Sequence, residues 1–176
     1  VCGGCPFGYT CSAEDGVRPC KEKTYSNGNT NDTCVGCGVG YFCPGGVDHT
    51  ACFAGAYQDE VNQTKCKTCP AGKYQLEEGQ TSCNICPAGY FCPEGAENPI
   101  ECGSLTVFCP IGSKVVTVAQ AGNYTIDSAG SALDKPKRRT NQIVCEDGYA
   151  CIGGEKSRCK DGTIASDNRA FCKNCE

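Results

Sequence analysis

Methionine and tryptophan are absent from this 176-residue chain, and histidine occurs once. Long aliphatic residues are sparse and never run long enough to line a single large core, so something other than a hydrophobic interior must hold the fold. No stretch approaches about 18 consecutive apolar residues, so this segment contains no membrane span. The net charge of −4 argues against a nucleic-acid partner.

Catalysis has little support in the sequence. His49 lies in the polar stretch Gly-Val-Asp-His-Thr, with no nucleophile or acid pair placed around it, so we expect a solvated surface histidine rather than a base. The acidic pairs Asp59-Glu60 and Glu77-Glu78 match no calcium-loop pattern, so we expect solvated carboxylates there. We therefore predict that the protein is not an enzyme, with no catalytic residue, no metal ligand and no cofactor.

Cysteine, in contrast, is abundant. The 20 cysteines make up about 11% of the chain, which is typical of a disulfide scaffold. Such thiol usage requires an oxidising compartment, so we predict an extracellular protein, secreted or on a cell surface. Each cross-link is expected to contribute roughly 2–4 kcal/mol in place of the missing core.

Tyrosine recurs on a fixed spacing. Tyr9, Tyr25, Tyr41 and Tyr57 are each 16 residues apart, and each tyrosine of the series follows a cysteine by four or five residues. A period of this length indicates a stack of small similar units that contact their neighbours. We expect these rings to pack between modules. The module-packing aromatics are predicted to be Tyr9, Tyr25, Tyr41, Tyr57, Tyr74, Tyr90 and Tyr149.

The cysteine spacing alternates a long loop, C-x-x-G-x-Y…C, with a tight loop, C-P-x-G-Y-x-C. Spacing alone does not fix the pairing. One scheme leaves no internal cysteine unpaired, and an interleaved pattern within each block of four is the alternative. That scheme closes the long loops as Cys20–Cys34, Cys52–Cys66, Cys69–Cys83 and Cys159–Cys172, and the short ones as Cys5–Cys11, Cys37–Cys43, Cys86–Cys92, Cys102–Cys109 and Cys145–Cys151.

Two cysteines have no partner in this scheme. Cys2 calls for a partner upstream and Cys175 for one downstream, so the pattern is cut at both ends. We expect a segment of a longer array, with an interchain disulfide as the less favoured alternative. Cys66, Cys69, Cys83 and Cys86 come near zinc-ribbon spacing, but a zinc site would strand other cysteines of the same register, so we favour disulfides.

The same register divides the chain into repeats. We predict cysteine-rich repeat 1 over residues 1–33, repeat 2 over 34–65, repeats 3 and 4 over 66–108, a cysteine-poor β-hairpin insert over 109–144, and an incomplete repeat 5 over 145–176. Within the insert, Val115–Val118 and Tyr124–Ile126 are expected to pair across a Gly122-Asn123 turn. The basic run Lys135–Arg139 is interpreted as a solvated loop, with a processing site or a polyanion contact as alternatives.

Three sequons of the N-x-S/T type predict N-linked glycans in a chain expected outside the cell. They begin at Asn31, Asn62 and Asn123. Asn31 and Asn62 fall at equivalent points of two long loops, so we expect their glycans at the repeat period.

The stretch from Cys69-Pro-Ala-Gly-Lys-Tyr to Cys86-Pro-Ala-Gly-Tyr resembles the ephrin-receptor-like cysteine-rich repeat, a relative of EGF-like and tumour-necrosis-factor-receptor-like modules. The segment from Cys109-Pro-Ile-Gly-Ser to Cys145-Glu-Asp-Gly-Tyr-Ala-Cys resembles a longer variant found in large extracellular proteins of single-celled eukaryotes. Gly38 stands where proline is usual, and Gln142 where the first cysteine of a pair would fall. Such repeats occur in receptors, adhesins and filaments alike, so the resemblance implies a module type and not one function.

Taken together, these patterns predict a small disulfide-rich fold, an elongated tandem array of cysteine-rich modules with short β-strands and turns and almost no helix. We expect an extracellular structural glycoprotein that forms a rigid segment of a stalk or filament, with a fibril subunit that assembles head to tail as one form of this function. Its partners would be neighbouring repeats of a longer chain or further copies of itself. The alternative is the ligand-binding ectodomain of a cell-surface receptor or adhesin.

Overall fold

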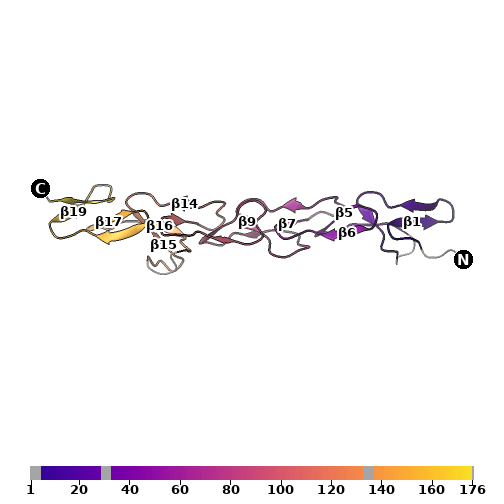
Figure 1. The fold of residues 1–176 in the computed structure, drawn as a ribbon, viewed down its shortest axis with the longest axis horizontal. Helices are drawn as coiled ribbons and strands as arrows, with labels where there is room; N and C mark the ends of the chain where they lie inside the picture. The colour runs from indigo at the N-terminus through magenta and orange to yellow at the C-terminus, as the bar shows by residue number, and fades with distance from the viewer. Residues whose placement is uncertain (1–4, 29–32, 133–136, 176) are drawn as a thin grey trace. The chain divides into compact units, whose positions relative to one another are not determined.

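The computed structural model describes residues 5–28, 33–132 and 137–175, and it contains short strands and turns with no helix in these ranges (Figure 1). The expected class, small, disulfide-rich and built from strands and turns, is confirmed. Within the described ranges, no helix is long and apolar enough to cross a membrane.

The chain divides into two compact units. The first comprises Val1–Pro70, Tyr74–Asn84 and Gly95–Asn98, and the second comprises Ala71–Lys73, Ile85–Glu94 and Pro99–Glu176. Every sheet of the described residues has two strands that are consecutive in sequence, so each is a local hairpin. The pairing is antiparallel in β1–β2, β3–β4, β5–β6 and β7–β8 and in all five sheets from β11 to β20. The five repeat ranges expected from the cysteines stay a prediction.

In the first unit, four hairpins follow one another. They are β1 (Tyr9–Ser12) with β2 (Gly16–Pro19), β3 (Thr24–Tyr25) with β4 (Val35–Gly36), β5 (Tyr41–Gly45) with β6 (Asp48–Ala51), and β7 (Ala56–Tyr57) with β8 (Lys67–Thr68). Next along the chain, β9 (Lys73–Tyr74) pairs with β10 (Asn84–Ile85).

The second unit contains five further hairpins. They are β11 (Tyr90–Phe91) with β12 (Ile100–Glu101), β13 (Val107–Phe108) with β14 (Thr117–Val118), β15 (Asn123–Ile126) with β16 (Asn141–Val144), β17 (Tyr149–Ile152) with β18 (Glu155–Arg158), and β19 (Thr163–Ala165) with β20 (Cys172–Asn174).

The strand pairing predicted for the hairpin inside the insert was wrong. Val107 pairs with Val118, and Thr125 pairs with Gln142, so the two segments predicted to face each other belong to different hairpins. A run of β-branched residues gives strand propensity but carries no information about which partner closes the ladder.

Nine disulfides join the cysteines in the same pairs as the scheme that left no internal cysteine unpaired. They are Cys5–Cys11, Cys20–Cys34, Cys37–Cys43, Cys52–Cys66, Cys69–Cys83, Cys86–Cys92, Cys102–Cys109, Cys145–Cys151 and Cys159–Cys172. The Cα–Cα distances of 5.6 to 6.1 Å lie in the range that a disulfide requires. Cys175 is a free, exposed thiol, and Cys2 lies outside the described residues.

The core consists mainly of these cross-links. Cys43, Cys52, Cys69 and Cys92 are completely buried, whereas many valines and isoleucines are exposed. Phe108 is the one large hydrophobic side chain that is buried in the part of the chain that the structure describes. Sulfur therefore occupies the interior that aliphatic side chains fill in an ordinary domain.

Candidate functional site: the joints between half-repeats

We call the segment that begins at the first cysteine of each loop a half-repeat. The C-x-x-G sequence at its start folds into a tight turn. The amide of Tyr9 donates to the carbonyl of Pro6 at 3.2 Å, and the glycine between them, Gly8, has φ of 80°. A left-handed conformation at the third turn position is the one that glycine adopts without a steric penalty. Lys23 occupies the same position in the second half-repeat, with φ of 73°.

The first joint bond runs from each half-repeat to the preceding one. The amide of the starting cysteine donates to the carbonyl of the preceding turn residue, as in Cys52 to Gly40 at 2.9 Å. The same bond recurs as Cys20 to Gly8, Cys37 to Lys23, Cys69 to Gly55, Cys86 to Gly72, Cys102 to Gly89, Cys145 to Gly122, Cys159 to Gly148 and Cys175 to Gly162.

The second joint bond runs in the other direction along the chain. The amides of seven turn residues, Gly8, Lys23, Gly40, Gly55, Gly72, Gly89 and Gly122, each donate to a carbonyl six residues after the next starting cysteine, seven in the Cys102 half-repeat. Examples are Gly40 to Gln58 at 2.7 Å and Gly72 to Cys92 at 2.8 Å. In a tight loop this acceptor residue is the second cysteine of the disulfide. In a long loop it is a buried polar residue, which the tyrosine and cysteine register did not reveal.

Gln58 and Gln75 show what the polar residue does. Each is almost fully buried, and its side-chain amide donates to a carbonyl of its own long loop, that of Lys65 at 2.7 Å for Gln58. The Gln75 amide does the same with the carbonyl of Ser82 at 2.8 Å. The glutamine thus ties the loop internally where a tight loop has a disulfide.

The tyrosine series is interleaved with cationic and imidazole side chains. His49 lies stacked between the rings of Tyr25 and Tyr41, with ring centroids 4.2 and 4.4 Å apart. The histidine is exposed, as expected, but its place between two tyrosines was not foreseen. It projects from β6 at the irregular register of the β5–β6 hairpin, a local detail that composition does not encode.

In the second unit, Lys156 likewise contacts two tyrosine rings, those of Tyr124 and Tyr149. Its Nζ lies 5.0 Å from the ring centroid of Tyr124 and 4.4 Å from that of Tyr149, and 2.5 Å from a carboxylate oxygen of Glu146. The hydrogen bond from Lys156 lowers the pKa of Glu146, and the carboxylate in turn raises the pKa of Lys156. Partial burial, and then the charge of Glu146, raise the pKa of the Tyr124 hydroxyl. Tyr124 was missed because Ala119 replaces the cysteine that marks its half-repeat.

Ala119 and Gln142 replace the disulfide of this half-repeat. Gln142 lies opposite Thr125 in β15–β16, which is the register of Cys172 opposite Ala165 in β19–β20. In place of a disulfide, two hydrogen bonds join Gln120 and Gln142. The side-chain amide of Gln142 donates to Gln120 Oε1 at 3.3 Å, and the backbone amide of Gln120 donates to Gln142 Oε1 at 2.9 Å. Gln142 therefore stands where sequence placed a missing cysteine, and Ala119 is its partner position.

Within the described part of the basic run, Lys137 and Arg138 are exposed, but Arg139 is not the solvated side chain that the sequence indicated. Arg139 is completely buried, and its guanidinium donates to the carbonyl oxygens of Ser131 and Ala132. Its own carbonyl accepts the amide of Cys109 at 2.9 Å. Arg138 lies over the ring of Tyr90 at 5.3 Å and contacts Glu101 at 2.7 Å. Residues 137–139 thus hold the insert against two tight loops; Lys135 lies outside the described residues.

The three sequons differ in how the structure describes them. Asn31 lies outside the described residues. Asn62 is exposed and has a φ of 58°. Its backbone amide donates to the carbonyl of Cys37 at 2.8 Å. Asn123 is half-buried at the start of β15, and its sequon hydroxyl, Thr125 Oγ1, is buried and donates to the carbonyl of Leu105 at 2.7 Å.

No group of three or more metal-binding side chains comes together within residues 5–28, 33–132 and 137–175. The paired carboxylates Asp59 and Glu60 both bond Lys67 at 2.7 Å. The Lys67 ammonium lowers the pKa of Asp59, so this acidic pair already has a cation. Glu77, which accepts a hydrogen bond from Gln80, and Glu78 are exposed, as expected of loop carboxylates.

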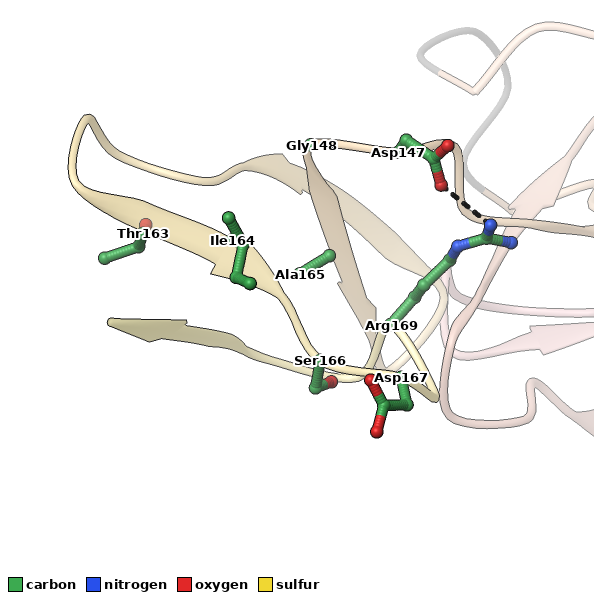
Figure 2. A pocket seen from close by; sticks show the side chains of 8 residues that line it. All are labelled: Asp147, Gly148, Thr163, Ile164, Ala165, Ser166, Asp167 and Arg169. Carbon is green, nitrogen blue, oxygen red and sulfur yellow. Dashed lines mark hydrogen bonds and ion pairs between the residues drawn. The ribbon is translucent and has the colours of Figure 1, made fainter. Parts of the chain in front are cut away.

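Two pockets open on the second unit. One, of about 390 Å³, is lined by Asp147, Gly148, residues 163–167 and Arg169 (Figure 2). The guanidinium of Arg169 bonds the carboxylate of Asp147 across its rim at 2.8 Å. The other, of about 460 Å³, lies against Leu105, Ala132, Tyr149, Glu155 and Lys156.

Residues 55–102 match the family described as tyrosine-protein kinase ephrin type A/B receptor-like. This part of the chain is therefore an ephrin-receptor-like cysteine-rich repeat, and the resemblance predicted from the sequence is confirmed there. No curated protein matches the sequence. The module type and the nine disulfides point to an extracellular domain.

Proposed function

We propose that this chain is a structural segment of an extracellular stalk or filament, in which each half-repeat is bonded to its neighbours in one fixed geometry. The recurrence of the same joint bonds, from Gly8 with Cys20 to Gly162 with Cys175, is the observation that carries the proposal. A repeated joint of constant geometry favours a spacer, because each repeat then sets the orientation of the next.

The joints leave little freedom for hinge motion. The joints at Gly8, Lys23, Gly40, Gly55, Gly72, Gly89 and Gly122 are bonded in both directions through the backbone, and a disulfide closes nearly every loop beside them. The disulfides reduce the number of conformations that each loop can adopt, so we expect little bending at the joints. The proposal includes no catalytic step, and its partners are neighbouring repeats of the same kind or further copies of the chain.

Small-angle X-ray scattering tests the spacer directly. A compact domain of this length has a radius of gyration of about 16 Å, so a stiff extended array is expected to give a clearly larger value with a rod-like distance distribution. A value near about 16 Å in the oxidised protein would remove the spacer function. A saturable soluble ligand found on such a compact particle would instead support the receptor ectodomain.

Glycans complete the proposal. We propose that the sequons at Asn31, Asn62 and Asn123 are occupied when the protein passes through a secretory pathway. Secreted material is treated with a glycosidase that converts the modified asparagine to aspartate, and peptides are then measured by mass spectrometry. Conversion at the exposed Asn62 is the expected result, with Asn62→Gln as the negative control.

A further inference from the structure

One tight loop of the second unit departs from the common turn. Cys102 and Cys109 are separated by seven positions, whereas the other tight loops have a separation of six. The amide of Ala119 donates to the carbonyl of Thr106 at 2.8 Å, so Thr106 holds the turn position that is glycine in the other tight loops. Val107 follows where those loops have tyrosine. The longer turn also brings in a leucine, Leu105, directly before Thr106.

The 460 Å³ pocket lies beside this irregular turn. Three segments of the second unit line it: the turn before β13 supplies Leu105, the β15–β16 connection supplies Ala132, and the β17–β18 hairpin supplies Tyr149, Glu155 and Lys156. Its volume falls within the range of about 300–1,000 Å³ that is usual for pockets that bind small molecules. The size of the pocket therefore suits a small ligand.

Hydrogen bonds from behind hold the walls of the pocket in place. The carbonyl of Leu105 accepts the hydroxyl of Thr125 at 2.7 Å, and the backbone of Gly154 packs against the same oxygen. The carbonyl of Ala132 accepts a hydrogen bond from the guanidinium of Arg139. Both donor side chains, Thr125 and Arg139, are completely buried. The walls are thus positioned before any ligand arrives, which lowers the ordering cost of binding.

The charges at the pocket leave one carboxylate uncompensated. Lys156 Nζ lies 2.5 Å from a carboxylate oxygen of Glu146, so these two charges neutralise each other. Glu155 is exposed on β18, and no lysine or arginine of the described residues forms an ion pair with it. The pocket therefore combines apolar walls at Leu105 and Ala132 with a single negative charge at Glu155.

We propose that this pocket binds a small organic ammonium ion, with its nitrogen at the Glu155 carboxylate and its apolar body against Leu105, Ala132 and Tyr149. Charge complementarity selects the cation, and the apolar walls select a ligand that carries a hydrocarbon or aromatic group beside it. A free amine and the side chain of a lysine on a neighbouring protein share this chemistry. The site goes beyond the proposed spacer function, and neither requires the other.

Titrations of the oxidised full chain, followed by NMR amide shifts, test the site with three probes of similar size: phenethylammonium, phenethyl alcohol and hydrocinnamate. Phenethylammonium is expected to shift the amides of Leu105, Tyr149 and Glu155 saturably and to bind more tightly than the alcohol. Hydrocinnamate should not bind, because Glu155 repels its carboxylate. No saturable shift with phenethylammonium, or equal affinity for all three probes, would overturn the proposal.

A fourth probe distinguishes the two sources of the ammonium group. The amide of Nα-acetyl-lysine presents a lysine side chain without the charges of a free amino acid. Tighter binding of this probe than of phenethylammonium assigns the pocket to a lysine of a neighbouring protein, and weaker binding assigns it to a free amine.

Substitution of the carboxylate locates the ammonium group. Glu155→Gln keeps the shape of the side chain and removes its charge, so the affinity for phenethylammonium is expected to fall roughly two- to fivefold. Glu94→Gln is the matched control, because Glu94 is an exposed glutamate of the same unit that does not line the pocket. Equal affinities of the two variants would overturn the assignment of Glu155.

Substitution of the apolar wall locates the body of the ligand. Leu105→Ala keeps the carbonyl that Thr125 bonds but removes the side chain, so phenethylammonium and phenethyl alcohol should both bind about fivefold more weakly. Unchanged affinity for both probes would place them outside the pocket and overturn the proposal. Because Glu155 is exposed, Glu155→Gln decides the proposal even where Leu105→Ala lowers stability.

Discussion

Single residues set the geometry of the turns, and Lys23 is the residue that departs from the common pattern. Its φ of 73° falls where the other half-repeats with this turn have glycine. A side chain in the left-handed region costs roughly 1–2 kcal/mol, and the added freedom of glycine in the unfolded chain offsets about half of that.

Lys23→Gly is therefore expected to increase the free energy of unfolding by about 0.5–1 kcal/mol. The joint bonds are preserved, because Lys23 contributes its amide to Cys43 and its carbonyl to Cys37. Denaturant unfolding measures the change. Lys21→Gly is the control, since Lys21 has no positive φ, and it is expected to lower stability; an equal response of both variants would contradict the argument.

The ion pair between Glu146 and Lys156 gives a second prediction at this scale. The hydrogen bond from Lys156 lowers the pKa of Glu146, so the stabilisation from this pair is present above the ordinary glutamate pKa and is lost as the pH falls through the lowered value. In Lys156→Met, the carboxyl titration of Glu146 followed by NMR is expected to move upward. Lys160→Met should leave it in place.

At the scale of elements, the alternation of tight and long loops could be predicted from the sequence because disulfides fix the register covalently. Cysteine spacing records which residues must come within bonding distance, and the nine pairs follow the simplest closure of that spacing. The insert has no such record. Its strands find partners through side chains such as Gln120, Gln142 and Arg139, whose contacts depend on the folded backbone.

The insert nevertheless keeps the register of a long-loop half-repeat, and this gives a third prediction. Ala119→Cys with Gln142→Cys should form a disulfide, because Gln142 has the register of Cys172. Closing this loop is expected to stabilise the protein by about 3 kcal/mol.

Mass spectrometry without reduction detects the new bond, and denaturant unfolding measures its effect. The double variant with serine at both positions is the control for loss of the Gln120–Gln142 hydrogen bonds. Two free thiols in the folded double-cysteine variant would show that Ala119 and Gln142 are not equivalent to a disulfide pair.

At the scale of the whole molecule, stability depends on sulfur rather than on an aliphatic interior. Excess reductant is therefore expected to abolish protected amide exchange across both units, because removing a native disulfide from a small domain costs roughly 2–5 kcal/mol. A strong chelator should change nothing. Loss of exchange protection with the chelator, and its persistence with reductant, would indicate a metal-held fold.

The function of the whole molecule is harder to predict from its sequence than its fold. Residues 55–102 identify the module type, and the joints explain how modules follow one another, but a module that serves receptors and filaments alike carries no ligand signature.

The two kinds of loop differ in how far their sulfur atoms lie from solvent. Both cysteines of Cys37–Cys43, Cys86–Cys92 and Cys145–Cys151 are at most 1% exposed, whereas Cys34, Cys66, Cys83 and Cys172, each the second cysteine of a long loop, are half-exposed. Among the tight loops, Cys5–Cys11 is the exception, because Cys11 is half-exposed as well. A thiolate attacks along the S–S axis and must reach one sulfur, so an attacking thiol meets the long loops and the Cys5–Cys11 loop before the buried tight loops. Mild reducing conditions are then expected to open the exposed disulfides while the buried tight loops stay closed. The chain would lose stiffness in steps before it unfolds.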